Sequence, residues 1–302
     1  EGEQLLMKVA LSPVSIEGAE ANLEAELPGW NFEATRLAAD KAWNDELSKV
    51  RVETADDAAK RIFYTALYHT LIHPNLLSDV NGEYPLMERS GEVGVTEGER
   101  YTVFSLWDTY RNVHQLLTLV YPERQVEMVR SMIDIYREWG WMPRWELYGR
   151  ETFTMEGDPA IPVITDTWMK GLRDFDIGTA YEAFRKSATT PGAQNLLRPD
   201  IDPYIERGYI PLGFYAQDLA GDVSVSHALE YYVADAALAR LADSLGHRED
   251  ARLFRERSLG YRHYYDREYG TLRPILPDGS FLTPFDPKAG ENFSAAPGFH
   301  EG

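Results

Sequence analysis

"TVFSLWDTYRNVHQLLTLVYPERQVEMVRSMIDIYRE", residues 102–138, contains two segments with the apolar periodicity of amphipathic helices, separated by the single residue Tyr121. The first segment spans Thr102–Val120 and the second spans Pro122–Glu138. Apolar residues that recur every three or four positions indicate helices that bury one face. Because a one-residue connection leaves no room for a crossover, the two helices are expected to be antiparallel neighbours. The stretch therefore predicts a helical hairpin.

The same helical periodicity recurs along the rest of the chain. A connector helix is expected to start near Asn31, and an extended strand is expected at Val9–Ser15. Nothing between the helices alternates convincingly as a strand. Further helices are predicted at Ala55–Leu71, Ala160–Leu172, Asp176–Ala188, Ser224–Leu245 and His247–Tyr265.

The connections between these helices are of two kinds. Tight turns are expected at Tyr121, Arg173–Phe175 and Gly246, whereas four connections run to about 20 residues or more. The long ones are Ile72–Tyr101, Trp139–Pro159, Thr189–Val223 and the segment from Asp266 onward. In a row of antiparallel helices every second connection lies at the same end, so the long loops gather on one face, which is the candidate site. This alternation predicts an all-α toroid of helical hairpins, the (α/α)6 barrel. A solenoid is disfavoured because the sequence shows no fixed repeat period.

Composition excludes several classes of function. The 302 residues include 49 acidic and 30 basic side chains, for a net charge of −19, which repels nucleic acid and anionic membranes. Cysteine is absent, so a thiolate metal site and a cysteine nucleophile are excluded. No apolar run approaches the roughly 20 residues of a membrane span, so membrane insertion is not expected.

The loop 141–162, "WMPRWELYGRETFTMEGDPAIP", concentrates aromatic, guanidinium and carboxylate side chains, among them Glu146 and Arg150. Sugars present C–H faces to aromatic rings and vicinal hydroxyls to charged groups, so this composition is typical of a carbohydrate site. The alternative is a buried ion-pair network that fixes a long loop.

The segment 104–114, "FSLWDTYRNVH", places Trp107, Asp108 and Arg111 on about one helical turn. They could contact a substrate, or Asp108 and Arg111 could form an ordinary i, i+3 salt bridge. His69 and His73 have i, i+4 spacing but lack the glutamate of a zinc motif, and no metal ligand is predicted in this chain. The sequence also lacks the G-x-S-x-G motif of a serine nucleophile. The chemistry that remains is acid–base catalysis by carboxylates on a neutral sugar or polyol.

Several longer runs resemble glycoside hydrolase family 92, the calcium-dependent exo-acting α-mannosidases. They occur in the family's order over nearly the whole chain, which is more specific than any single motif. The runs are "FYTALYHTLIHPNLLSDVNGEYP" (63–85), "YTVFSLWDTYRNVH" (101–114), "WELYGRETFTMEGDPAIPVI" (145–164), "GYIP" (208–211), "DGSFLTPFDP" (278–287) and the final "GFHEG".

The resemblance implies a domain organisation. Residues 1–15 would end an N-terminal β-sandwich, residues 16–52 would form a helical linker, and residues 53–302 would form the first part of an (α/α)6 catalytic barrel. The partners of the chain would then include its own missing N-terminal and C-terminal segments, and a secreted or periplasmic location is implied.

The resemblance also implies a chemistry, namely removal of terminal α-linked mannose from a glycan with inversion of configuration. Glu301 matches the family's general acid, and His300 precedes it. Calcium would assist, with its ligands and the general base beyond Gly302. We accordingly expect Glu301 to be catalytic, and Trp107, Asp108, Glu146, Arg150 and His300 to bind substrate.

Two other classes of function fit the same aromatic and acidic loops. One is another (α/α)6 enzyme, either a glycoside hydrolase of different specificity or a polysaccharide lyase. The other is a noncatalytic glycan-binding helical module.

Overall fold

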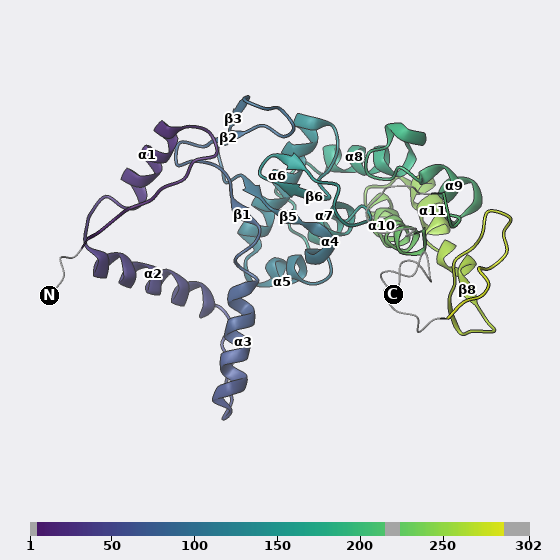
Figure 1. The fold of residues 1–302 in the computed structure, drawn as a ribbon, viewed down its shortest axis with the longest axis horizontal. Helices are drawn as coiled ribbons and strands as arrows, with labels where there is room; N and C mark the ends of the chain where they lie inside the picture. The colour runs from purple at the N-terminus through teal and green to yellow at the C-terminus, as the bar shows by residue number, and fades with distance from the viewer. Residues whose placement is uncertain (1–4, 215–223, 287–302) are drawn as a thin grey trace.

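Helices dominate the computed structural model, which describes residues 5–214 and 224–286 (Figure 1). Six helices form three antiparallel hairpins. They are α5 (Val113–Val120) with α6 (Pro122–Trp139), α7 (Ala160–Met169) with α8 (Ile177–Thr189), and α10 (Ser224–Ser244) with α11 (Arg248–Arg257). The predicted tight turns connect the two helices within each hairpin.

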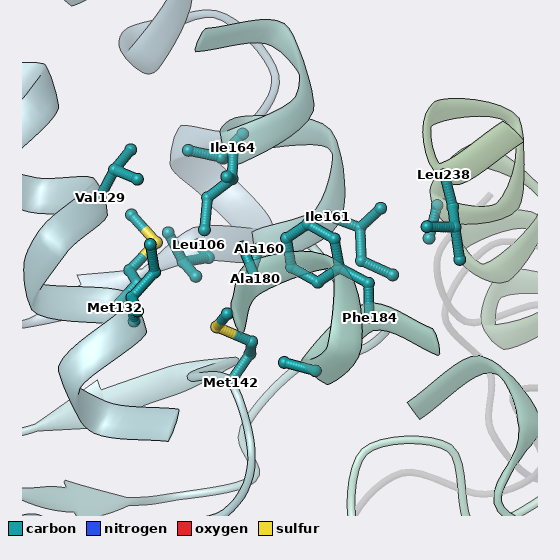
Figure 2. Close-up of a cluster of buried hydrophobic side chains, with 14 of the residues drawn as sticks. Leu106, Val129, Met132, Met142, Ala160, Ile161, Ile164, Ala180, Phe184 and Leu238 are labelled. Carbon is teal, nitrogen blue, oxygen red and sulfur yellow. The ribbon is translucent and has the colours of Figure 1, made fainter. Parts of the chain in front are cut away.

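The hairpins pack side by side in chain order. The first helix of the middle hairpin, α7, contacts α5 and α10, while α6 contacts α8. Their shared core draws apolar side chains from four of these helices and from the short α4 (Leu106–Thr109) (Figure 2). Leu106, Met132, Ile161 and Phe184 are completely buried in it. This arrangement agrees with the predicted row of helical hairpins.

The helix predicted at Thr102–Val120 is wrong in its first half. Tyr101–Thr102 and Phe104–Ser105 form the short strands β4 and β5, and α4 is followed by a break before α5 begins at Val113. Val103 has a φ of 61° and Asn112 lies at φ −157°, neither of which a helix accommodates. Tertiary contacts therefore override the local helical pattern here.

Short strands occur inside the long loops, where none was predicted. In the first loop β1 (Asn75–Leu76) pairs with β4, and β2 (Glu83–Pro85) pairs with β3 (Val93–Val95). Strands β6 (Trp145–Leu147) and β7 (Arg150–Glu151) form a hairpin that β5 extends to three antiparallel strands. Near the end of the described chain β8 (Tyr265–Asp266) pairs with β9 (Thr271–Leu272). Each strand is only two or three residues long, too short for a periodic signal.

The N-terminal arm contains α1 (Ile16–Glu26), α2 (Phe32–Leu47) and α3 (Asp57–His69), and Figure 1 shows α2 and α3 projecting from the body. Helices α2 and α3 confirm the predicted connector and first helix, and α1 lies within residues 16–52, where the resemblance implies a helical linker. The extended segment expected at Val9–Ser15 enters no β-ladder among the described residues, and its assignment to the end of a β-sandwich stays a prediction. The arm is tied to the first loop by Asp79, which accepts hydrogen bonds from Ser12 and Asn22.

The remaining elements lie in the last two loops. Helix α9 (Ile201–Arg207) was not predicted, and the helix predicted to reach Tyr265 ends at Arg257. Two 3₁₀ turns, η1 (Gly192–Gln194) and η2 (Gly260–His263), complete the list. A second apolar cluster, rich in tyrosine, packs α9 against α10 and against Tyr264, which follows η2.

Candidate active site

The long loops contact one another in succession, as the alternation of connections predicted. The backbone N–H of Glu88 in the first loop donates to the Gly149 carbonyl of the second at 2.8 Å. Asp158 of the second loop pairs with Arg198 of the third at 3.1 Å. Leu212 of the third donates to Ile275 of the fourth at 2.7 Å. We call this junction of loops the rim.

Helix α4 stands at the rim as a single turn with two distinct faces. At 100° per residue, Leu106, Thr109 and Tyr110 fall on one side, and Trp107, Asp108 and Arg111 fall on the other. Burial follows this division, because Leu106 and Tyr110 are buried whereas Asp108 and Arg111 are exposed. The turn therefore presents the predicted tryptophan and aspartate outward.

The outward face is held by a residue of α10. Glu230 accepts a hydrogen bond from the Tyr110 hydroxyl at 2.7 Å and pairs with Arg111 at 2.9 Å. The Arg111 guanidinium in turn lies 4.7 Å from the Trp107 ring centroid, within the range of a cation–π contact. The salt bridge considered between Asp108 and Arg111 does not form, since Arg111 pairs with Glu230 instead.

Two polar groups of this face retain capacity for a ligand. Asp108 accepts a hydrogen bond from the Ser105 hydroxyl through Oδ2, and its Oδ1 accepts none from the described residues. The indole N–H of Trp107 is buried and finds no acceptor within the same part of the chain. A carboxylate oxygen can accept a hydrogen bond from a sugar hydroxyl, and an indole N–H can donate one.

Glu146 lies in the interior, where its contacts favour the loop-fixing alternative over a sugar contact. Its carboxylate accepts hydrogen bonds from the Thr102 hydroxyl at 2.8 Å, from Val103 N at 3.0 Å and from Gly149 N at 2.6 Å. Burial raises the pKa of Glu146, and the hydrogen bonds from Gly149 and Thr102 oppose that rise. The carboxylate joins the first and second loops and stabilises the unusual backbone at Val103.

Arg150 is not brought together with Trp107 and Asp108. Its exposed side chain lies 3.9 Å from Glu88 and lines a groove of about 910 Å³ between the N-terminal arm and the first two loops. Neither Trp107 nor Asp108 lines this groove. The remaining two predicted site residues, His300 and Glu301, lie outside the described residues.

Buried charges behind the rim were not predicted as a unit. Arg198 is fully buried between Asp158 and Asp235, and Asp235 also accepts hydrogen bonds from Tyr204 and Arg257. A signal was present in the sequence, because Asp235 is the lone charge in the apolar run "YYVADAALA" of residues 231–239. An aspartate on a helix face that is otherwise buried requires a partner.

A second buried cluster joins the loops to α10. His227 lies 3.0 Å from Asp200 and 3.6 Å from Glu156, and Tyr231 donates to Asp200 at 2.6 Å. The two clusters together connect the second loop, the third loop and α10 without exposing a charge.

Within residues 5–214 and 224–286, no group of three or more His, Cys, Asp or Glu side chains is arranged so that it could hold a metal ion. His73 contacts Asn75 through Nδ1. The calcium ion that the sequence resemblance implies would take its ligands beyond Gly302, so no residue of this rim is assigned to it. None of the described helices is long and apolar enough to cross a bilayer.

Comparison with known proteins gives consistent matches. A model of the glycosyl hydrolase family 92 catalytic domain matches residues 18–302. An uncharacterized secreted glycosidase of Arthroderma benhamiae is 27% identical over 248 residues, which are 79% of this chain and 28% of that protein.

Two solved structures from Bacteroides thetaiotaomicron are also similar. A family GH92 α-mannosidase is 34% identical with a TM-score of 0.84, over 96% of this chain and 37% of that chain. That enzyme has also been solved with mannoimidazole. A family GH92 inverting mannosidase is 30% identical with a TM-score of 0.81, over 91% of this chain and 37% of its own. The chain thus spans little more than a third of either solved relative.

Proposed function

Because the chain belongs to glycosyl hydrolase family 92, we propose that it is part of an α-mannosidase that removes terminal α-linked mannose from glycans. The observation that carries the proposal is the family match over residues 18–302. The similarity to two solved structures, one of an α-mannosidase and one of an inverting mannosidase, supports it. The mannoimidazole complex of one of them supports a mannose-type ligand. A secreted or periplasmic location is proposed by analogy with the secreted relative.

Trp107 and Asp108 are the described residues best placed to bind the sugar. The exposed Asp108 carboxylate would accept hydrogen bonds from hydroxyl groups, and the Trp107 indole N–H would donate one. Charge-assisted hydrogen bonds of this kind are stronger than those between neutral groups. Arg111 and Glu230 keep the tryptophan and the turn in place.

The proposed reaction is hydrolysis with inversion. Glu301, as general acid, would donate a proton to the leaving glycosidic oxygen, while a carboxylate elsewhere in the full-length protein removes a proton from the attacking water. In inverting enzymes the two carboxyl groups stand about 6.5–9.5 Å apart, which leaves room for that water. Calcium would polarise the sugar hydroxyls, and we place the calcium ligands outside the described residues.

The three hairpins fit the proposed (α/α)6 barrel as consecutive parts of it. In such a barrel the first helix of each hairpin lies inside, which matches the packing of α5, α7 and α10 in a row. The proposed domain limits remain residues 1–15, 16–52 and 53–302.

The test is an assay of the full-length protein on α-linked mannobiose. NMR would follow the reaction and identify which anomer of mannose is released first. Mannose should be released as the β-anomer, and a chelator should abolish release until calcium is restored. Glu301→Gln should lower kcat by about 10²–10⁴-fold, because general acid catalysis contributes about that much. Glu33→Gln, an equal change on exposed α2, is the control and should leave kcat unchanged.

Wild-type rates in Glu301→Gln would remove Glu301 from the acid role. Calcium-independent hydrolysis of a different glycoside would overturn the mannosidase assignment. Tight binding of mannose without any turnover would select the glycan-binding module instead.

A further inference from the structure

A row of buried hydrogen bonds runs from the back of α4 across three helices. His114 Nε2 lies 3.0 Å from the Thr109 hydroxyl, and His114 Nδ1 lies 2.9 Å from Gln125 Oε1. Gln125 Nε2 then donates to Thr167 at 2.9 Å, and the Thr167 hydroxyl donates to the Val163 carbonyl at 2.8 Å. His114, Gln125 and Thr167 are at most 1% exposed.

The row has a single direction. The Val163 carbonyl only accepts, so the Thr167 hydroxyl must donate to it and must accept from the Gln125 amide N–H. The amide oxygen of Gln125 therefore faces His114 and accepts from Nδ1–H. Nε2 of the neutral imidazole is then an acceptor, and the Thr109 hydroxyl donates to it. Each donor is matched to one acceptor.

His114 stays neutral within this row. Burial lowers its pKa to about 4, and the hydrogen bond with Gln125 only partly opposes that effect. Both ring nitrogens contact uncharged groups. The imidazole therefore acts through its fixed tautomer and not through a charge.

Helix α4 needs such external support because it is one turn long. An isolated turn of helix does not hold itself, since fixing its backbone costs more than its hydrogen bond returns. Ser105 makes no side-chain cap to the α4 backbone. The supports are Leu106 in the core, Tyr110 on Glu230, and Thr109 on His114.

We propose that His114 is a positioning residue for sugar binding, acting through Thr109 to fix the turn that presents Trp107 and Asp108. The inference rests on the proposed function, because the effect of this support is expected to appear as a change in affinity for mannose. Thr109 directly follows Asp108 in the chain, 100° further around the turn, so a shift of the Thr109 backbone moves the Asp108 carboxylate with it.

The experiment removes the Thr109 hydroxyl at nearly constant volume in the full-length protein. Thr109→Val should weaken binding of mannoimidazole by about tenfold, as expected for loss of one buried hydrogen bond, and raise KM for α-linked mannobiose more than it changes kcat. Thr109→Ser keeps the hydroxyl and should restore both values. Thr118→Val is the matched control, because Thr118 is a buried threonine of α5 whose hydroxyl donates to the Gln115 carbonyl and accepts from Lys170, away from α4.

A double-mutant cycle assigns the effect to His114. If the two side chains act as one unit, His114→Phe combined with Thr109→Val should bind mannoimidazole no more weakly than His114→Phe alone. Additive losses would overturn the role of His114. Should His114→Phe fail to fold, the comparison of Thr109→Val with Thr109→Ser still decides, and unchanged affinity in Thr109→Val overturns the proposal.

Amide hydrogen exchange separates this inference from the proposed function. Exchange at residues 106–110 should increase in Thr109→Val and not in Thr118→Val, whether or not the protein binds mannose. If the wild type neither binds nor hydrolyses mannosides, the proposed function fails, while faster exchange in Thr109→Val still supports the positioning of α4. Unchanged exchange in an active enzyme overturns the positioning alone.

Discussion

At the scale of single residues, His114 makes stability depend on pH. Its pKa is about 4 in the folded protein, against 6.5 for an exposed imidazole. Between these values the unfolded chain binds a proton that the folded protein does not, so acid favours unfolding. The contribution is fully present above pH 6.5 and is lost as pH falls toward 4, to a total of about 3 kcal/mol.

Urea unfolding at pH 7.0, 5.5 and 4.5 measures this loss. Carboxylates titrate in the same range, so the relevant quantity is the difference between variants. His114→Phe should flatten the pH dependence of the unfolding free energy, whereas His69→Gln, at an exposed histidine of α3, should not. An equal slope in His114→Phe and wild type would contradict the lowered pKa.

Residue types alone did not distinguish the two kinds of carboxylate in this chain. Asp108 and Glu146 both stand among aromatic and basic neighbours, and both were predicted to bind substrate. The structure exposes the first and surrounds the second with donors from Thr102, Val103 and Gly149. Thr102 and Val103 lie more than 40 positions away, so spacing within the loop carried no information about them.

At the scale of elements, the hairpin β6–β7 has a turn whose residues do not all suit it. Tyr148 and Gly149 connect Leu147 to Arg150, with φ of 50° and 82°. A two-residue turn with positive φ at both positions favours Asn-Gly. Tyr148 is 59% exposed, so Tyr148→Asn should relieve backbone strain with little loss of packing and raise the unfolding free energy by about 1 kcal/mol.

Thermal and urea unfolding would show the change. Gly149→Ala provides the opposite case, because a Cβ at φ 82° is strained, and it should lower stability by about 1 kcal/mol. A loss of stability in Tyr148→Asn would show that packing of the tyrosine ring beside the groove stabilises the fold by more than the strained backbone at Tyr148 destabilises it.

Element prediction succeeded where helices are long and failed where loops constrain them. Helices α6, α7, α8 and α10 start within one residue of their predicted positions. The segment 102–112 kept a helical pattern in sequence, yet Glu146 accepts from Val103 N and holds it at positive φ. A contact between residues 43 positions apart cannot be read from local periodicity.

At the scale of the whole molecule, the buried charges around Arg198 connect the loops to the helices. Arg198 contacts Asp158 of the second loop and Asp235 of α10, and Arg257 of α11 reaches the same Asp235. Arg198→Met would leave two buried carboxylates short of a partner. Removing one member of a buried ion pair costs about 3–5 kcal/mol, so a loss of that size is expected in the unfolding free energy.

The matched control is Arg36→Met on α2, whose salt bridges to Glu33 and Asp40 are solvent-exposed. Exposed pairs contribute about 0–1 kcal/mol, so this variant should unfold close to wild type in urea. Similar losses of unfolding free energy in both variants would show that the buried ion pairs of Arg198 stabilise the fold no more than exposed ion pairs do.

The gathering of the long loops was predictable because it follows from connectivity, which the sequence displays directly. Three short connections, at Tyr121, 170–176 and 245–247, fix which of the long connections share an end, whatever the internal structure of those loops. Which side chains meet at the rim was not predictable, because Arg198, Asp158 and Asp235 come from three separate segments.

The pole opposite the rim has a practical use. Gly246 joins α10 to α11 with φ 84°, and an added Cβ would meet nothing within 4 Å. The loops at the other end hold one another, so they have little freedom to accept an inserted segment. An affinity tag or a fluorescent reporter grafted at Gly246 would point away from the rim, which makes this turn the natural attachment point for immobilising the protein.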